Sequence, residues 1–153
     1  MTPASTNAPP IVLDSNVVLD WLVFRDPSSR AVAAAITSGR LRWVATPAML
    51  EELEHVLTRG SLSAWQPDVD GILAHWHAWA APVAPAPAAP FGALRCTDPD
   101  DQKFIDLALH AGAVALLSRD RAVLKLARRA HRFGLRIQTA AAWARALAPE
   151  FAQ

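Results

Sequence analysis

The chain has 153 residues, of which 52% are hydrophobic and 19% are charged. This composition supplies enough apolar side chains for the core of one domain and excludes a disordered chain. Fifteen Lys and Arg residues face fourteen Asp and Glu residues, so the net charge of +1 neither demands nor excludes a nucleic acid as partner.

Several further classes of protein are disfavoured by the sequence. A single cysteine, Cys96, excludes an internal disulfide framework and a Cys-based zinc site, and it favours a reducing, cytoplasmic location. No apolar run reaches the roughly 18 residues needed to span a bilayer, so no membrane contact is expected. Residues 1–10 are uncharged and lack the pattern of a signal peptide. We expect them to form a disordered N-terminal tail before a single domain over residues 11–150.

The first half of the chain alternates short apolar runs with helical patterns. Ile11-Val12-Leu13 is typical of a buried parallel strand. Thr46-Pro47 predicts a helix start, with Thr as N-cap and Pro in the first turn. The expected elements are a strand at 11–13, helices at 16–24 and 29–37, a strand at 42–45, and helices at 46–58 and 66–80. Four prolines between Pro82 and Pro90 then predict an extended connection.

The second half repeats this alternation. Asp98-Pro99 opens a predicted helix that ends at Gly112, and Thr139 caps a final Ala-rich helix. Between them we expect a strand at 114–117, a helix at 120–131 and a strand at 135–138. Strands alternating with helices predict an α/β protein, a three-layer α/β/α sandwich around a central, mainly parallel sheet.

Acidic residues follow two of the predicted strands. Asp14 comes directly after the first strand, and Asp120 follows the strand over 114–117, with Ser118 and Arg119 between them. In open parallel sheets the carboxyl ends of the strands face the ligand crevice. A carboxylate beside the core is costly unless something positive binds it. One such acid could merely cap the next helix, but two strands ending in this way favour a functional site.

The helix over 46–58 offers a third source of acids. At about 100° per residue, its buried stripe contains Met49 and Leu53, and Glu51 projects into solvent on the opposite side. Glu52 and Glu54 lie on the two edges of the stripe. Either residue could reach a cleft, and the helical geometry does not choose between them.

A run of three acids opens the helix after Pro99. Asp98 has a structural explanation as N-cap, but this does not explain why Asp100 and Asp101 are also acidic. Three carboxylates in four residues repel one another, and a bound cation would relieve the repulsion. Carboxylates without a cysteine cluster select hard cations such as Mg²⁺ or Mn²⁺. On the same helix, Asp106 points away from the predicted buried face and is expected outside.

Basic residues are concentrated in one segment. Between Arg119 and Arg136 there are seven basic residues and one acid, Asp120. The segment is either the solvated face of a helix or a surface that contacts phosphate groups. In the second interpretation Arg119, Arg121 and Lys125 are the candidate nucleic-acid-binding residues, since they lie next to the predicted acidic pocket.

Four motifs occur in an order and spacing that resemble a PIN domain, from about Ile11 to Ala142. They are Ile11-Val12-Leu13-Asp14-Ser15-Asn16-Val17-Val18, Thr46-Pro47-Ala48-Met49-Leu50-Glu51-Glu52-Leu53, Thr97-Asp98-Pro99-Asp100-Asp101-Gln102-Lys103-Phe104 and Leu116-Leu117-Ser118-Arg119-Asp120. Each motif alone is weak, but the ordered set is specific. The bacterial branch described as toxin components of toxin–antitoxin pairs is the most similar.

The resemblance implies a nuclease with an acidic metal centre, typically an Mg²⁺- or Mn²⁺-dependent ribonuclease. The residues that match the four acids of the family, and are therefore expected to be catalytic and to bind metal, are Asp14, Glu52, Asp101 and Asp120. The residues expected to support them are Asn16, Ser118, Asp98 and Asp100. Arg119 stands where the family commonly has Gly, which would alter access of the substrate.

The expected mechanism is in-line attack of hydroxide on phosphorus, which leaves a 5′-phosphate and a 3′-hydroxyl. The resemblance also suggests an RNA substrate, a cognate antitoxin protein and a homodimer. Trp76 and Trp79 lie three residues apart and would form a partner patch if exposed. Two alternatives stay open: a non-catalytic PIN-like module that binds nucleic acid or protein, and a metal-dependent phosphatase. The phosphatase is disfavoured because Asn16 replaces the second acid of its Asp-x-Asp motif.

Overall fold

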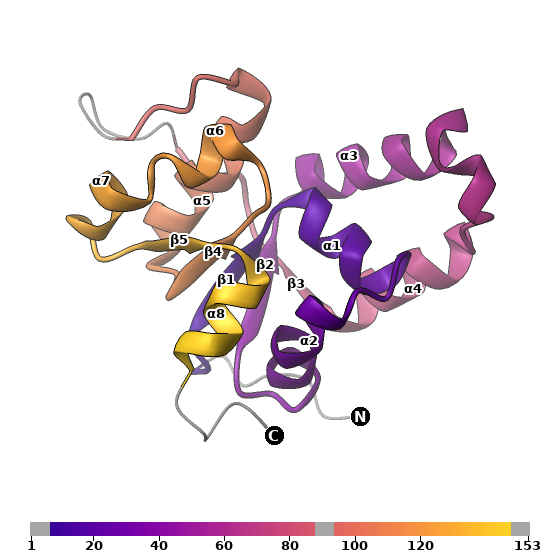
Figure 1. Ribbon diagram of the computed structural model, residues 1–153, viewed down its shortest axis with the longest axis horizontal. Helices are drawn as coiled ribbons and strands as arrows, with labels where there is room; N and C mark the ends of the chain where they lie inside the picture. Colours follow the sequence, from indigo (N-terminus) through magenta and orange to yellow (C-terminus); the bar gives the residue numbers. More distant parts are fainter. Residues whose placement is uncertain (1–6, 88–93, 148–153) are drawn as a thin grey trace.

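The computed structural model describes residues 7–87 and 94–147 of the chain. Its centre is one parallel sheet with the strand order β3-β2-β1-β4-β5 (Figure 1). The strands are β1 (Pro10–Leu13), β2 (Arg42–Ala45), β3 (Ala80–Pro82), β4 (Ala115–Leu117) and β5 (Arg136–Gln138). The expected parallel sheet is therefore confirmed.

Eight α-helices surround the sheet in the described part of the chain. They are α1 (Ser15–Leu22), α2 (Arg30–Thr37), α3 (Pro47–Thr58), α4 (Val69–Trp79), α5 (Gln102–Ala111), α6 (Arg121–Leu124), α7 (Ala127–His131) and α8 (Ala140–Ala146). Short 3-10 helices precede α2 and α5 and follow α3, at Pro27–Ser29, Pro99–Asp101 and Gly60–Trp65. Among the described helices, none has both the length and the apolar character needed to cross a membrane.

The direction of the crossovers explains the three layers. The connections from β1 to β2 and from β2 to β3 step toward one edge of the sheet, whereas those from β3 to β4 and from β4 to β5 step toward the other. Because such crossovers are right-handed, the two groups of helices lie on opposite faces. Helix α8 packs beside α2, and α5 packs against β1 and β4 (Figure 1). The three-layer α/β/α sandwich is thus confirmed.

The same connections create a topological switch point at the carboxyl end of β1. From β1 the chain leaves toward β2, and β4 lies on the other side of β1. Strand order reverses at this point, which is where open parallel sheets bind ligands. The segments that follow β1 and β4 begin at Asp14 and Ser118, so both lie at this switch point.

The sheet interior and a group of rings form the core. Ile11, Val12 and Leu116 are fully buried, as expected for strands covered on both faces. Trp43 packs against two further tryptophans, with ring centroids 5.6 Å from Trp21 and 4.8 Å from Trp76. Trp76 is therefore a core residue, and the conditional partner patch of Trp76 and Trp79 does not form.

The N-terminal boundary differs slightly from the expectation. Strand β1 begins at Pro10 rather than Ile11, and the carbonyl of Pro9 accepts a hydrogen bond from the backbone N–H of Arg42 at 2.9 Å. The expected disordered tail falls mainly on residues 1–6, which lie outside the described part of the chain. Residues 148–150, at the expected end of the domain, also lie outside it.

Two elements differ more strongly from the sequence-based expectation. Strand β3 falls where a helix end was expected, because Ala80 and Ala81 pair with Trp43 and Val44 of β2. Its last residue, Pro82, is tolerated because β3 is an edge strand. The single helix expected over 120–131 is two helices, α6 and α7. No Gly or Pro marks this break, so no local signal predicts it.

Candidate metal centre

Asp14 is held rigidly at the carboxyl end of β1. Its backbone N–H donates to the carbonyl of Leu117 at 2.9 Å, which extends the pairing with β4. The hydroxyl of Ser118 donates to Oδ2 of Asp14 at 2.7 Å, and only 3% of Asp14 is exposed. Burial raises the pKa of Asp14 above its ordinary value and outweighs the lowering by the Ser118 hydrogen bond.

The segment after β4 brings Asp120 to the same place. The backbone N–H of Asp120 donates to the Ser118 hydroxyl oxygen at 2.9 Å, and that of Arg119 donates to Oδ1 of Asn16 at 3.0 Å. Asp120 also caps α6, since its Oδ1 accepts from the N–H of Ala122 at 2.8 Å. Asn16 and Ser118 therefore fix this segment against the start of α1.

The acidic run before α5 supplies two further carboxylates. Asp98 caps the 3-10 turn, because its Oδ1 accepts from the N–H of Asp100 at 3.0 Å. The backbone N–H of Asp101 donates to the carbonyl of Asp98 at 3.1 Å, so both side chains leave the same tight turn. Asp100 is exposed and contributes its carbonyl oxygen, which accepts from Lys103 at 2.7 Å.

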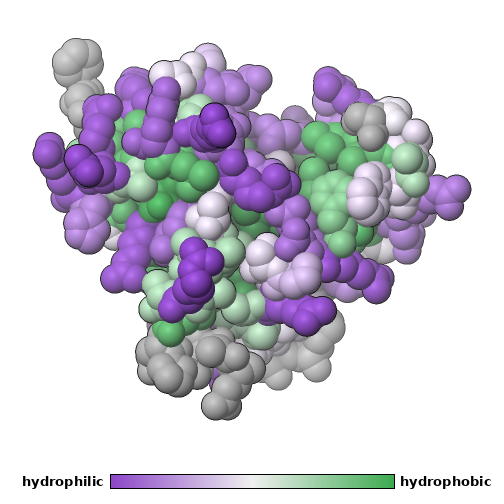
Figure 2. All heavy atoms as spheres, viewed as in Figure 1, coloured by the Kyte–Doolittle hydropathy of each residue, from purple (hydrophilic) through white to green (hydrophobic). Residues whose placement is uncertain are grey.

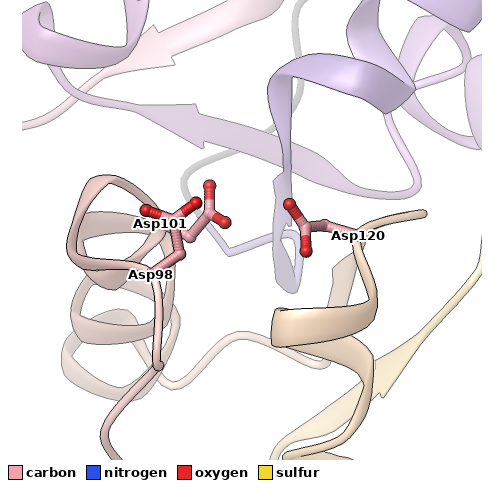
Figure 3. Close-up of side chains that lie close together, drawn as sticks. All are labelled: Asp98, Asp101 and Asp120. Atoms are coloured by element: carbon pink, nitrogen blue, oxygen red, sulfur yellow. The ribbon is translucent and has the colours of Figure 1, made fainter.

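Three carboxylates converge where these segments meet. Asp98, Asp101 and Asp120 each offer an oxygen within 4.8 Å of the others. Figure 3 shows Asp98 and Asp101 side by side, facing Asp120 across a gap. Asp14 lies close enough to raise the pKa of Asp101 electrostatically, so the two acids share this end of the sheet. The structure thus brings together carboxylates from three segments of the chain.

Asp101 is repelled by the neighbouring carboxylates in this arrangement. Its Oδ2 is buried and has no hydrogen-bond partner in the described structure. Burial first, and then repulsion from Asp14 and Asp120, raises the pKa of Asp101 to about 7. A buried oxygen without a hydrogen-bond donor, among several carboxylates, fits a divalent cation. Hard cations such as Mg²⁺ and Mn²⁺ prefer carboxylate oxygens as ligands.

Glu52, rather than Glu54, approaches the centre from α3. Glu52 is half-buried, whereas Glu51 and Glu54 are exposed. Oε1 of Glu52 forms an ion pair with Nζ of Lys103 at 2.7 Å, and Oε2 accepts a hydrogen bond from the hydroxyl of Ser15. Glu52 adds to the pKa rise of Asp14 but is not part of the group formed by Asp98, Asp101 and Asp120.

An ion pair that sequence reasoning missed lies beside the centre. Nε of Arg119 contacts Oδ2 of Asp20 at 2.6 Å, and Nη2 contacts Oδ1 at 3.0 Å. Asp20 is only 5% exposed. A buried acid within the apolar helix over 15–22 requires such a partner, and this could have signalled the pair. Arg119 is thus ion-paired although its side chain is 52% exposed, and Arg121 and Lys125 also have exposed side chains.

Gln102 was also missed, and it fixes the segment that leads to the acidic run. Its Oε1 accepts from the N–H of Cys96 at 2.7 Å, and its Nε2 donates to the carbonyl of Leu94 at 2.9 Å. The same amide donates to Oδ1 of Asp106 at 2.9 Å, so Asp106 is half-buried and not outside as expected. Sequence reasoning also did not predict the two residues that contact Glu52, which are Lys103 and Ser15.

Comparisons with known proteins agree with this geometry. A family model described as "PIN domain" matches residues 10–122. A chain in the crystal structure of VapBC2 from Rickettsia felis, bound to a DNA fragment from their promoter, is similar in fold with a TM-score of 0.56. That chain is 13% identical, and the match covers 84% of this chain and 98% of the other. A comparison with curated proteins finds no match.

Proposed function

Because the chain belongs to the PIN-domain family, we propose that it is a metal-dependent ribonuclease that hydrolyses RNA phosphodiesters. The buried, unpaired Oδ2 of Asp101 beside Asp98 and Asp120 carries this proposal. Carboxylates are concentrated at the topological switch point of the sheet, and one of their oxygens lacks a hydrogen-bond donor. This arrangement favours binding of a cation over a purely structural role in the core.

The proposed ligands of Mg²⁺ or Mn²⁺ are the carboxylates at this switch point, Asp14, Asp101 and Asp120, with Asp98 beside them. Such an ion polarises a phosphoryl oxygen and lowers the pKa of bound water. The chain's own contribution is to hold these ligands in place: Ser118 fixes Asp14 and the backbone of Asp120 through one hydroxyl. Glu52 stands beside this group, where it is placed to orient the attacking water.

The substrate would be bound through its phosphates. Arg121 and Lys125 are exposed in the segment that Asp120 begins, so their charges lie next to the carboxylates. Arg128 and Arg129 continue the exposed basic surface along α7. A negatively charged centre bordered by cations suits a polyanion: the carboxylates would hold an ion at the scissile phosphate, and the basic side chains would bind the neighbouring phosphates.

We further propose that the chain acts in the cytoplasm as the toxin of a toxin–antitoxin pair and forms a homodimer. The similar solved structure is a VapBC2 complex on promoter DNA, which supports a protein partner. Figure 2 shows a hydrophobic surface between α3 and α4, next to α1. Trp65, at the end of the 3-10 helix after α3, is 58% exposed and contacts the ring of Phe24. An antitoxin would lay an apolar or basic segment over such a surface and over the acidic centre.

The decisive experiment is cleavage of a labelled RNA by the purified chain with Mn²⁺. Asp14→Asn should reduce the rate by on the order of 10²-fold or more while the protein stays folded by circular dichroism. Asp70→Asn, at an exposed acid in the first turn of α4, is the matched control and should keep the full rate.

Full activity of Asp14→Asn would overturn the proposal. Two other results would point to the alternatives: RNA binding that needs no metal and gives no cleavage favours a binding module, and release of phosphate from a small phosphoester favours a phosphatase.

A further inference from the structure

Glu52 is the one acid of the expected quartet whose two oxygens are both engaged by side chains of the described structure. Nζ of Lys103 lies 2.7 Å from its Oε1, and the Ser15 hydroxyl donates to its Oε2. Asp101, in contrast, keeps a buried oxygen without a partner among the described residues. The four acids are therefore not equivalent: one of them already has a cation.

The ammonium group of Lys103 is held in a defined position. It donates to the Glu52 carboxylate and to the carbonyl of Asp100, each at 2.7 Å, and lies 4.9 Å from the ring centroid of Phe104. The side chains of Lys103 and Glu52 are each 29% exposed, so the pair is partly withdrawn from water. A contact between two helices with three anchors differs from a mobile surface ion pair.

The location of Lys103 connects the pair to the metal centre. Lys103 follows Asp101 by two residues at the start of α5, and Glu52 reaches it from α3. Glu52 also lies near Asp14, whose pKa it helps to raise. The Lys103 ammonium thus contacts the one acid of the expected quartet that comes from α3.

We propose that Lys103 takes the place of a second divalent cation, so that the centre binds one Mg²⁺ or Mn²⁺ ion and Glu52 is not among its ligands. This inference rests on the proposed function and specifies its metal site. The reason is competition for the same oxygen: a metal ion can use Oε1 of Glu52 only by displacing the ammonium that already neutralises it.

The test is the number of Mn²⁺ ions bound by the full-length chain, measured by isothermal titration calorimetry and by electron paramagnetic resonance of free Mn²⁺. Wild type should bind about one ion. Lys103→Met removes the charge but keeps the chain length, and should bind a second, weaker ion at the freed Glu52. Adding Glu52→Gln to Lys103→Met should return the count to about one.

Two controls separate this role from a loss of positive charge or of folding. Lys103→Arg keeps the cation and should bind as wild type does, and Arg30→Met, at an exposed site at the start of α2, should also leave the count unchanged. Circular dichroism confirms that each variant is folded.

Two ions in the wild type, or an unchanged count in Lys103→Met, would overturn the inference and leave the nuclease proposal standing. Absence of any bound Mn²⁺ in the wild type would overturn both.

Discussion

Ser118 joins the ends of two strands through one hydroxyl group. It donates to Oδ2 of Asp14 at 2.7 Å, across a separation of 104 residues, and accepts from the backbone N–H of Asp120 at 2.9 Å. The hydroxyl therefore serves as donor and acceptor at once, and Ser118 is completely buried. Two of the proposed metal ligands depend on this one side chain for their position.

Ser118→Ala should lower both stability and metal affinity. The substitution leaves the buried Asp14 carboxylate without this donor and the Asp120 N–H without its acceptor, so the free energy of unfolding should fall by about 1–3 kcal/mol. Urea denaturation measures this change, and calorimetry measures the weaker binding of Mn²⁺. Ser63→Ala, at an exposed serine, should change stability by less than about 0.5 kcal/mol. Equal effects of the two substitutions would contradict the role of Ser118.

The pKa of Asp101 predicts a pH dependence of the metal-free protein. This pKa is raised from 3.8 to about 7, so the folded chain binds the proton more tightly than the unfolded chain. The contribution of Asp101 to stability is fully present below about pH 3.8 and is lost as the pH rises through about 7. In metal-free buffer Tm should therefore fall over this window, and the Tm of Asp101→Asn should fall less. A wild-type Tm that falls no more than that of the variant would contradict this sign.

Mn²⁺ binding should show the opposite pH dependence. The metal binds the ionised carboxylates, so a proton on Asp101 competes with it, and affinity should weaken by up to about tenfold per pH unit below the pKa of about 7. Calorimetry on both sides of that pKa measures the slope. Asp101→Asn should bind weakly and without this slope. Affinity that is constant over the same range would exclude Asp101 as a ligand.

The pair of Arg119 and Asp20 should matter for stability. Arg119→Ala leaves the buried Asp20 carboxylate without its two hydrogen bonds, and the free energy of unfolding should fall by about 1.5–3 kcal/mol. Arg119→Lys should recover only part of this loss, because an ammonium cannot make the bidentate contact. Urea denaturation compares both with Arg128→Ala, at an exposed site on α7, for which little change is expected. Full recovery by Lys would contradict the bidentate role.

Arg121 and Lys125 should contribute to RNA affinity through charge alone. With both residues changed to Ala, the slope of log affinity against log salt should become shallower by about 1.4, since each contact with a single-stranded phosphate contributes about 0.7. Fluorescence anisotropy with a labelled single-stranded RNA in EDTA measures the slope without cleavage. Arg30→Ala combined with Arg59→Ala, at exposed sites elsewhere, should leave it unchanged. An unchanged slope in the first pair would remove these two residues from the binding surface.

Local sequence patterns predict only part of the fold. The apolar runs of β1 and β4 are visible as strands because both are buried on two faces, and Asp14 and Asp120 are visible because they interrupt that pattern. Strand β3 is not visible, since Ala80 and Ala81 have little strand propensity and are ordered by pairing with β2.

The candidate site, like the fold, can be predicted only in part from the sequence. Helical angles place Glu52 and Glu54 on two edges of α3, and only the folded contacts with Ser15 of α1 and Lys103 of α5 select Glu52. Lys103 gives no signal of its own, because its role comes from contact with Glu52 on α3, which lies 51 residues away in the sequence. The acids can thus be proposed from sequence, whereas their partners depend on the folded arrangement.

Cys96 lies beside the acidic centre in a form of low reactivity. Burial raises the pKa of its thiol, and the nearby carboxylates Asp101, Asp120 and Asp98 add to this, while the thiol donates to the carbonyl of Ala122 at 3.5 Å. The thiolate fraction at neutral pH is therefore smaller than for an ordinary cysteine. Because the thiolate is the form that peroxide attacks, Cys96 should be oxidised slowly, and its sulfur should stay reduced beside the carboxylates.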